Sequence, residues 1–226
     1  MKKRLLSLIM AVMMVVVLVV PAAAATTDTT SGGTVTVYVT YGMFTEGGYD
    51  TAKKAPAKQA YNSDAAPTSD KINSNFYINA YTLSINTIKT DYMETTQYAY
   101  GVPDTSVSYF KTPNLVDAIL AAFVEKDIDI TDPNVVSAGW DDHPVRGNPG
   151  GYINYVAPQY PVYNETIKET RDGVLYNVYS GEGWNIACGT SASNIKALDA
   201  YGTSTALEDG MIIVFDFSPY LIYDVL

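Results

Sequence analysis

One segment of this sequence has the apolar period of a helix, and it lies among segments that alternate like strands. Residues 111–130 read KTPNLVDAILAAFVEKDIDI. Four apolar residues fall at i, i+3, i+4 and i+7 along one side of such a helix: Val116, Ile119, Leu120 and Phe123. Thr112 is the expected N-cap and Pro113 the first helical residue, where a missing N–H is harmless. The spacing predicts a helix that ends near Lys126 and packs this stripe on a sheet.

The strands of that sheet are marked by alternation. TVTVYVTYG, residues 34–42, places three valines on one face and Thr and Tyr on the other, which predicts a strand with one buried face. Strand chemistry recurs over 75–90, and a further strand is expected from Tyr92 towards Gly101. A strand is predicted over 174–179 and is expected to continue over 183–189 after Gly181-Glu182-Gly183, and another strand is predicted over 211–217 after an Asp-Gly turn. These patterns indicate an α+β fold, a mixed sheet packed on one main helix.

Two stretches show no convincing period and are expected to be inserted loop regions. Residues 43–75 are rich in Ala, Lys, Asp, Ser and Pro, and residues 132–161 are rich in turn-forming Pro and Gly. Composition shows no linker beyond residue 33. We therefore expect residues 34–226 to form a single domain.

The N-terminal residues are typical of an export signal. Three basic residues at positions 2–4 precede an apolar run of about 16 residues and then four alanines. A run of this length is short of the ~20 residues that span a bilayer, which favours cleavage over an uncleaved anchor. We expect residues 1–25 to be a signal peptide, cleaved within Ala22–Thr26, and residues 26–33 to be a flexible leader. The mature protein is then secreted or extracellular, at the bacterial cell surface or free of it, and not inserted in the membrane.

Acidic residues outnumber basic ones. The chain has 14 Lys and Arg against 24 Asp and Glu, and loss of three basic residues with the signal leaves 11 against 24, a net charge of −13. A surface of this sign repels a phosphate backbone and anionic lipid. Nucleic acid is therefore not an expected partner.

Few residues offer catalytic chemistry. His143 is the single histidine and Cys188 the single cysteine. A Cys188–His143 pair needs a third orienting group, and neither neighbourhood supplies one. Asp141 and Asp142 precede His143, but adjacent residues of an extended segment point to opposite faces, which favours a turn over a metal site. We expect no catalytic residue, no metal and no cofactor, hence no enzyme; a hydrolase that uses paired carboxylates in the inserted loops is the weaker alternative.

The stretch EGWNIACG, residues 182–189, combines one of the two tryptophans with that cysteine. In a strand, Trp184, Ile186 and Cys188 share one face, and Asn185 and Ala187 share the other. No neighbouring base or cation lowers the pKa of the thiol, so Cys188 is expected to be an inert core residue. Trp184 is either a core anchor or part of a binding surface.

Four segments, in order, resemble those of a known family. They are TVTVYVTYG, NLVDAILAAF at 114–123, GWNIACG at 183–189 and ALDAYGTSTALEDGMIIVFDF at 197–217. The chain resembles a bacterial exported domain family of unknown function that is related to the C-terminal domain of transcobalamin and intrinsic factor. The resemblance implies a β-grasp-like sheet wrapped around one helix, and corrinoid binding as a family-level function. Cys188 and Ala187 depart from it, because the family usually has more polar residues after the tryptophan.

The function we expect is an exported, non-catalytic binding module for a small cobalamin-like ligand, a glycan or a surface protein. Aromatic rings supply stacking surface, and those at 132–161 lie among turn residues that favour exposure. The residues expected to contact the ligand are Trp140, His143, Tyr152, Tyr155, Trp184 and Asn185. The alternative is a structural or adhesive component of a cell-surface assembly, because the last residues, YLIYDVL, are apolar enough to dock on a partner.

Overall fold

The protein was analysed as a computed structural model that describes residues 32–69, 72, 74–100, 111–141, 150–159, 161–164, 166–198 and 202–226. Residues 31–226 form one compact unit. The predicted signal peptide, most of the predicted leader, Asp142 and His143 lie outside the described residues. Within them, no helix has both the length and the apolar character needed to cross a membrane.

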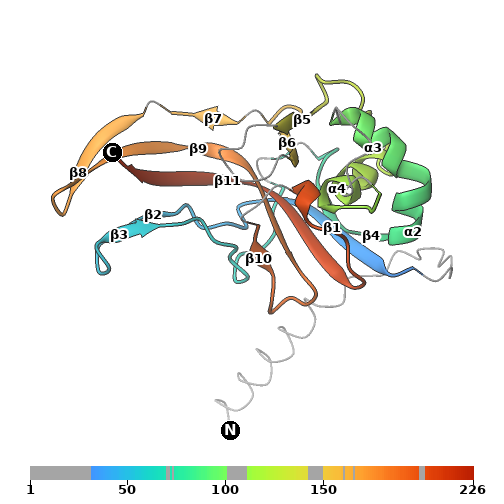
Figure 1. Ribbon diagram of the computed structural model, residues 1–226, viewed down its shortest axis with the longest axis horizontal. Coiled ribbons are helices and arrows are strands. Elements are labelled where there is room, and N and C mark those ends of the chain that lie inside the picture. The colour runs from blue at the N-terminus through green and yellow to red at the C-terminus, as the bar shows by residue number, and fades with distance from the viewer. Residues whose placement is uncertain are drawn as a thin grey trace, which may run out of the picture. The chain divides into compact units, whose positions relative to one another are not determined.

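The main sheet is mixed, with the first and last strands side by side at its centre (Figure 1). Its order is β10 (Lys196–Ala197), β9 (Val174–Gly189), β11 (Met211–Val225), β1 (Thr34–Tyr41) and β4 (Ile78–Ser84). β1 and β11 run parallel, and the other neighbours in this order run antiparallel. Two short strands, β7 (Val162–Tyr163) and β8 (Ile167–Arg171), pair with β9. The predicted α+β class, a mixed sheet with one main helix, is confirmed.

The main helix, α4 (Leu115–Val124), packs on one face of this sheet. Phe123 makes edge-on contacts with Phe76 and with Phe215 of β11, at ring-centroid distances of 6.0 and 6.4 Å. The predicted N-cap, Thr112, is wrong. Asn114 caps the helix because its side chain accepts from the N–H of Val116 and of Asp117, and Asp117 accepts in return from the Asn114 N–H.

Residues 85–99 are helical, where the alternation predicted strands. The segment comprises α2 (Ile85–Thr87), a π-helical turn η1 (Ile88–Tyr92) and α3 (Met93–Ala99). The residues that it buries, Ile88 and Thr96, are β-branched, and a buried tyrosine, Tyr100, follows the last turn. These residue types are enriched in strands, so their composition concealed the helical period.

The inserted regions hold small sheets of their own. In the first, β2 (Gly48–Asp50) pairs with β3 (Ala55–Ala57), and in the second β5 (Val136–Asp141) pairs with β6 (Gly150–Val156). The strand predicted over 174–179 does continue over 183–189, because β9 pairs with β11 without a break from Tyr176 to Gly189. β11 in turn continues through the apolar C-terminal residues to Val225.

Both faces of the sheet are covered at its centre. The alternation of β1 predicted one buried face, made of Val35, Val37 and Val39, and these residues are buried beside α4. On the opposite face Thr40 is only 1% exposed, and Val214 of β11 only 3%. The reason is that the first inserted region folds back over this face. This second cover and the sheet bound a pocket between them.

Candidate functional site

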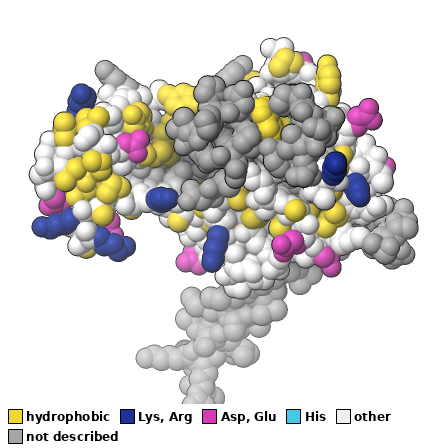
Figure 2. All heavy atoms as spheres, viewed as in Figure 1, with side chains coloured by type: hydrophobic (Ala, Val, Ile, Leu, Met, Phe, Trp, Pro, Cys, Tyr) yellow, Lys and Arg dark blue, Asp and Glu magenta, His cyan; other side chains and the backbone are white. Residues whose placement is uncertain are grey.

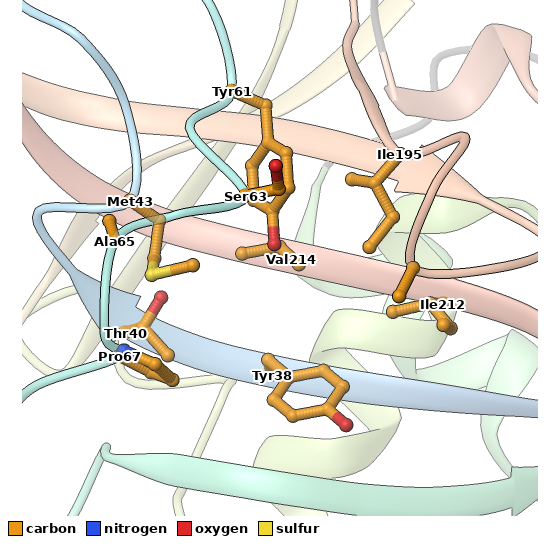
Figure 3. A pocket seen from close by; sticks show the side chains of 11 residues that line it. Tyr38, Thr40, Met43, Tyr61, Ser63, Ala65, Pro67, Ile195, Ile212 and Val214 are labelled. Atoms are coloured by element: carbon orange, nitrogen blue, oxygen red, sulfur yellow. The ribbon is translucent and has the colours of Figure 1, made fainter. Parts of the chain in front are cut away.

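A pocket of about 210 Å³ lies on the sheet face opposite α4 (Figure 3). Its floor comes from the two central strands: Tyr38 and Thr40 of β1, and Ile212 and Val214 of β11. In the parallel register Tyr38 is the partner of Val214 and Thr40 is the partner of Asp216. Because alternate residues of a strand share a face, these four side chains and Asp216 point to the same side of the sheet.

The walls come from two segments far apart in the sequence. The segment after β1 contributes Met43, Tyr61, Ser63, Ala65 and Pro67, and the turn between β9 and β10 contributes Ala192 and Ile195. The chain leaves β1 through Gly42, whose φ of +80° suits glycine. Backbone bonds then fix the first wall, with Asn62 N donating to Met43 O at 2.8 Å and Tyr41 N to Thr68 O at 3.0 Å.

Tyr61 is held by its neighbour Phe44. The two rings meet edge to face with centroids 5.9 Å apart, and Phe44 is itself buried. Figure 3 shows that the Tyr61 side chain extends from one wall towards Val214 and that Tyr38 lies on the opposite side of the pocket. The site therefore presents two tyrosine rings that come from different parts of the fold.

Asp216 is a buried carboxylate next to the pocket. It is 0% exposed, and its Oδ1 accepts from the Thr40 hydroxyl at 2.7 Å. Its Oδ2 accepts from Met43 N at 3.0 Å and from the Ser218 hydroxyl. Burial raises the pKa of this carboxyl above its ordinary value, and the hydrogen bonds from Ser218, Thr40 and Met43 oppose that rise. Since Thr40 and Met43 also line the pocket, the carboxylate lies directly behind its wall.

The negative charge of Asp216 has no cationic partner within the described part of the chain. Its donors are neutral hydroxyl and amide groups, and the salt bridges between described residues lie elsewhere, for example between Arg171 and Glu169. The eleven lining residues carry no charged side chain either. Burial, the charge of Asp216 and the neighbouring Tyr38 together raise the pKa of Tyr61, so this phenol stays protonated near neutral pH.

This arrangement offers a mostly apolar surface that can contact a small molecule. Its lining includes two tyrosines, a methionine and aliphatic residues, and Tyr38, Thr40, Tyr61 and Ser63 carry hydroxyl groups. Apolar walls with a few convergent polar groups are typical of small-molecule sites. The described residues include no group of three or more His, Cys, Asp or Glu arranged to hold a metal ion.

The aromatic residues predicted for the second inserted region belong to the β5–β6 hairpin, and none of them lines the pocket. In the β5–β6 hairpin Trp140 is the partner of Gly151, and Tyr152 is the partner of Gly139. Trp140 packs against the main core. Tyr155 is only 7% exposed, so its expected exposure is wrong. Turn residues in this region had suggested a surface loop, but the region pairs as a hairpin whose apolar side closes over the helix. His143 lies outside the described residues.

Trp184 and Asn185 occupy opposite faces of β9. Trp184 stacks on Phe215 with ring centroids 4.4 Å apart and an interplanar angle of 12°, on the side that faces α4. Ile186 and Cys188 follow on that side, so the predicted shared face is confirmed. Asn185 is the partner of Asp216 on the pocket side, although its amide donates to Gly183 O at 3.1 Å. Among the predicted site residues that the structure describes, Asn185 therefore lies on the opposite sheet face from Trp184, and none of them lines the pocket.

Sequence reasoning missed the pocket residues for two different reasons. Asp216 did leave a signal, because it is a carboxylate within MIIVFDF, a run that otherwise predicts a buried strand. Met43 and Tyr61 left none, because they lie in a segment without a period and only the folded backbone brings them over the sheet.

A second surface is apolar and exposed. Five residues of β7, β9 and β11 share one face by register, and we call them the arm face: Tyr163, Leu175, Tyr179, Tyr220 and Ile222. Tyr163 is 79% exposed, and Leu175 and Ile222 are 44% and 45% exposed. Figure 2 shows hydrophobic side chains gathered at the end where Figure 1 places β8.

No protein family, curated protein or solved structure matches this chain. The candidate site is therefore defined by its geometry.

Proposed function

We propose that this domain is a non-catalytic binding module and that the pocket between β1, β11 and the first inserted region holds its small ligand. The observation that carries the proposal is the pocket wall itself. Two tyrosine rings, a thioether and aliphatic side chains line the pocket, and a buried carboxylate lies behind its wall. Apolar side chains that line an open pocket, with a buried charge beside it, favour the binding of a ligand that packs against those side chains.

The volume sets the size of the ligand. A dry cavity of about 150 Å³ accepts benzene, so a pocket of about 210 Å³ suits one substituted ring or a branched group of similar size. A whole corrin macrocycle is larger than this. If the ligand is a corrinoid, as the family resemblance implies, the pocket takes one ring or side arm of it. A single sugar ring of a glycan also fits this size.

The strand arrangement supports the family interpretation. The first and last strands are parallel neighbours at the centre of the sheet, antiparallel strands flank them, and one main helix packs on one face. A β-grasp-like fold has this arrangement. Together with the signal-like N-terminal sequence, it supports an exported module of the transcobalamin-C-terminal kind.

The proposal is tested by calorimetric titration with a panel of single-ring aromatics, monosaccharides and corrinoids. Tyr61→Ala removes one ring from the pocket and should weaken any ligand of the panel at least tenfold. Tyr179→Ala is the matched control, because it removes a tyrosine from the arm face and should leave affinity unchanged. A ligand that binds both variants as tightly as the unmodified protein would place its site elsewhere.

The arm face favours a second candidate function, adhesion or assembly at the cell surface. Exposed tyrosine and aliphatic side chains on long, regular strands are typical of protein interfaces. In this case light scattering shows oligomers that grow with concentration, and Ile222→Lys disperses them. A monomer at all concentrations, together with ligand binding lost in Tyr61→Ala, would exclude this candidate in favour of the first.

A further inference from the structure

We infer that the pocket selects a small organic cation, of the quaternary ammonium class, over a neutral ligand of the same shape. The inference rests on the proposed function, because it takes the pocket as the binding site. It goes further by naming the charge and chemical class of the ligand.

The first observation is the isolated charge of Asp216. A buried carboxylate is costly unless a cation or several donors compensate it, and here three neutral donors lower that cost without neutralising the charge. Both carboxylate oxygens accept hydrogen bonds, which is the pattern of the ionised form. In surroundings of low dielectric constant, a charge acts over a longer range than in water. The adjacent pocket therefore has a negative potential that attracts cations and repels anions.

The second observation is the pair of tyrosine rings. The face of an aromatic ring is negative, and a cation within about 6 Å of the ring centroid is attracted to it. Tyr38 and Tyr61 approach the pocket from β1 and from the first inserted region, on different sides (Figure 3). Aromatic faces on more than one side are how proteins enclose quaternary ammonium groups.

The remaining lining distinguishes between classes of cation. Ile195, Ile212 and Val214 present aliphatic groups, and none of the lining residues carries a carboxylate that points into the pocket as a direct partner. A primary ammonium is strongly hydrated and needs acceptors for its three N–H donors. A quaternary ammonium has methyl groups and no donor. Its apolar surface matches the aliphatic lining, while its charge matches the potential from Asp216.

Asp216 also anchors the chain after β1, through Met43 N, so substitution of Asp216 tests the fold as well as the site. The experiment therefore varies the ligand. The probes are choline and 3,3-dimethyl-1-butanol, its neutral carbon isostere, titrated calorimetrically into the protein at low ionic strength. We expect choline to bind at least tenfold more tightly than the alcohol. Tyr61→Leu should weaken choline more than the alcohol and narrow that ratio, and Tyr179→Leu should leave both affinities unchanged.

The outcomes separate this inference from the proposed function. Equal or tighter binding of the alcohol overturns the cation inference and leaves the pocket as a binding site. If neither choline nor the alcohol binds, but an aromatic or a sugar of the panel binds and Tyr61→Ala weakens that binding, the cation inference is overturned and the proposed function stands. If no ligand of the panel binds, the inference and the proposed function both fall.

Discussion

Thr40 donates its hydroxyl to Asp216 Oδ1 at 2.7 Å, across 176 positions of the sequence. The two residues are register partners in the parallel pair of β1 and β11, and they are 1% and 0% exposed. Asp216 also accepts from the backbone N–H of Met43, in the pocket wall. This one carboxylate therefore joins the first strand, the last strand and the inserted region that covers them.

Thr40→Val tests the contribution of this bond, because valine keeps the shape and removes the donor. A hydrogen bond to a charged group contributes roughly 1.5–3 kcal/mol, so we expect the free energy of unfolding to fall by about 2 kcal/mol. Thr36→Val on the same strand is the control. Its hydroxyl meets that of Thr82 at 3.2 Å in a solvent-exposed pair, and its loss should change stability by less than about 0.5 kcal/mol. If urea unfolding shows the same decrease in the free energy of unfolding for both variants, the buried hydrogen bond contributes no more to stability than the exposed one.

Asp117 should make stability depend on pH. Burial raises its pKa from 3.8 to about 6, against hydrogen bonds from Thr96, Asn114 N and Tyr100. The folded state then binds the proton more tightly than the unfolded state. The contribution of this group to the free energy of unfolding is therefore greatest below pH 4 and falls as the pH rises to about 6, by an amount on the order of 3 kcal/mol.

The variant Asp117→Asn removes this titration, so its unfolding free energy should lack the decrease between pH 4 and 6 that Asp117 contributes. Asp129→Asn is a control of opposite sign. Hydrogen bonds from Thr131 lower the pKa of Asp129, so the stability that it contributes is present at neutral pH and is lost as the pH falls. If Asp117→Asn and the unmodified protein show parallel pH profiles in chemical denaturation, the buried carboxyl does not titrate in this range.

Gly181 and Gly183 lie two residues apart on β9 and should respond differently to alanine. A Cβ at Gly181 would lie 1.8 Å from Val162 O and 2.6 Å from the Tyr220 hydroxyl oxygen, so β7 must move. A Cβ at Gly183 would lie 3.6 Å from the nearest Tyr220 ring atom, an ordinary contact. We expect Gly181→Ala to lower the free energy of unfolding by about 1–3 kcal/mol, as overpacking does. Gly183→Ala should change it by less than about 1 kcal/mol, and a reversed order would contradict the packing of Tyr220.

Trp184→Ala should separate stability from binding. The indole stacks on Phe215 and contacts Phe217, so its removal should lower the free energy of unfolding by about 3 kcal/mol, as for other large aromatic truncations. The ring lies on the face opposite the pocket, and binding by the remaining folded protein should be unchanged. If Trp184→Ala loses binding while its thermal stability is unchanged, Trp184 belongs to the ligand site and this prediction is wrong.

The predictable part of the fold is where local pattern and tertiary structure agree. The stripe Val116, Ile119, Leu120 and Phe123 identified α4, and the valines of β1 identified its buried face. The strand prediction for residues 85–99 was wrong. The buried Thr96 hydroxyl donates a hydrogen bond to Asp117, 21 residues away, and no local pattern encodes that partner. The predicted continuation of β9 past Gly181 and Gly183 is confirmed although glycine weakens strands, and Tyr220 of the neighbouring strand lies against both positions.

The candidate site was less predictable than the fold. Sequence reasoning favoured exposed aromatic residues near turns, and two of these, Trp140 and Tyr155, pack into the structure instead. The pocket depends on which face residues 43–67 cover, and that is decided by contacts such as Phe44 N to the Ser218 hydroxyl at 3.3 Å. Such long-range pairings cannot be derived from periodicity.

The most direct test of the binding pocket uses the methionine methyl groups as reporters. Between residues 32 and 226 the methionines are Met43, Met93 and Met211, and Met43 lines the pocket while Met211 is buried on the α4 side. We predict that titration of protein labelled with ¹³C at its methionine methyls shifts the Met43 signal with choline, or with whichever panel ligand binds, and leaves Met93 and Met211 unmoved. Saturable binding by calorimetry without a shift of Met43, or with equal shifts of all three, would contradict the account.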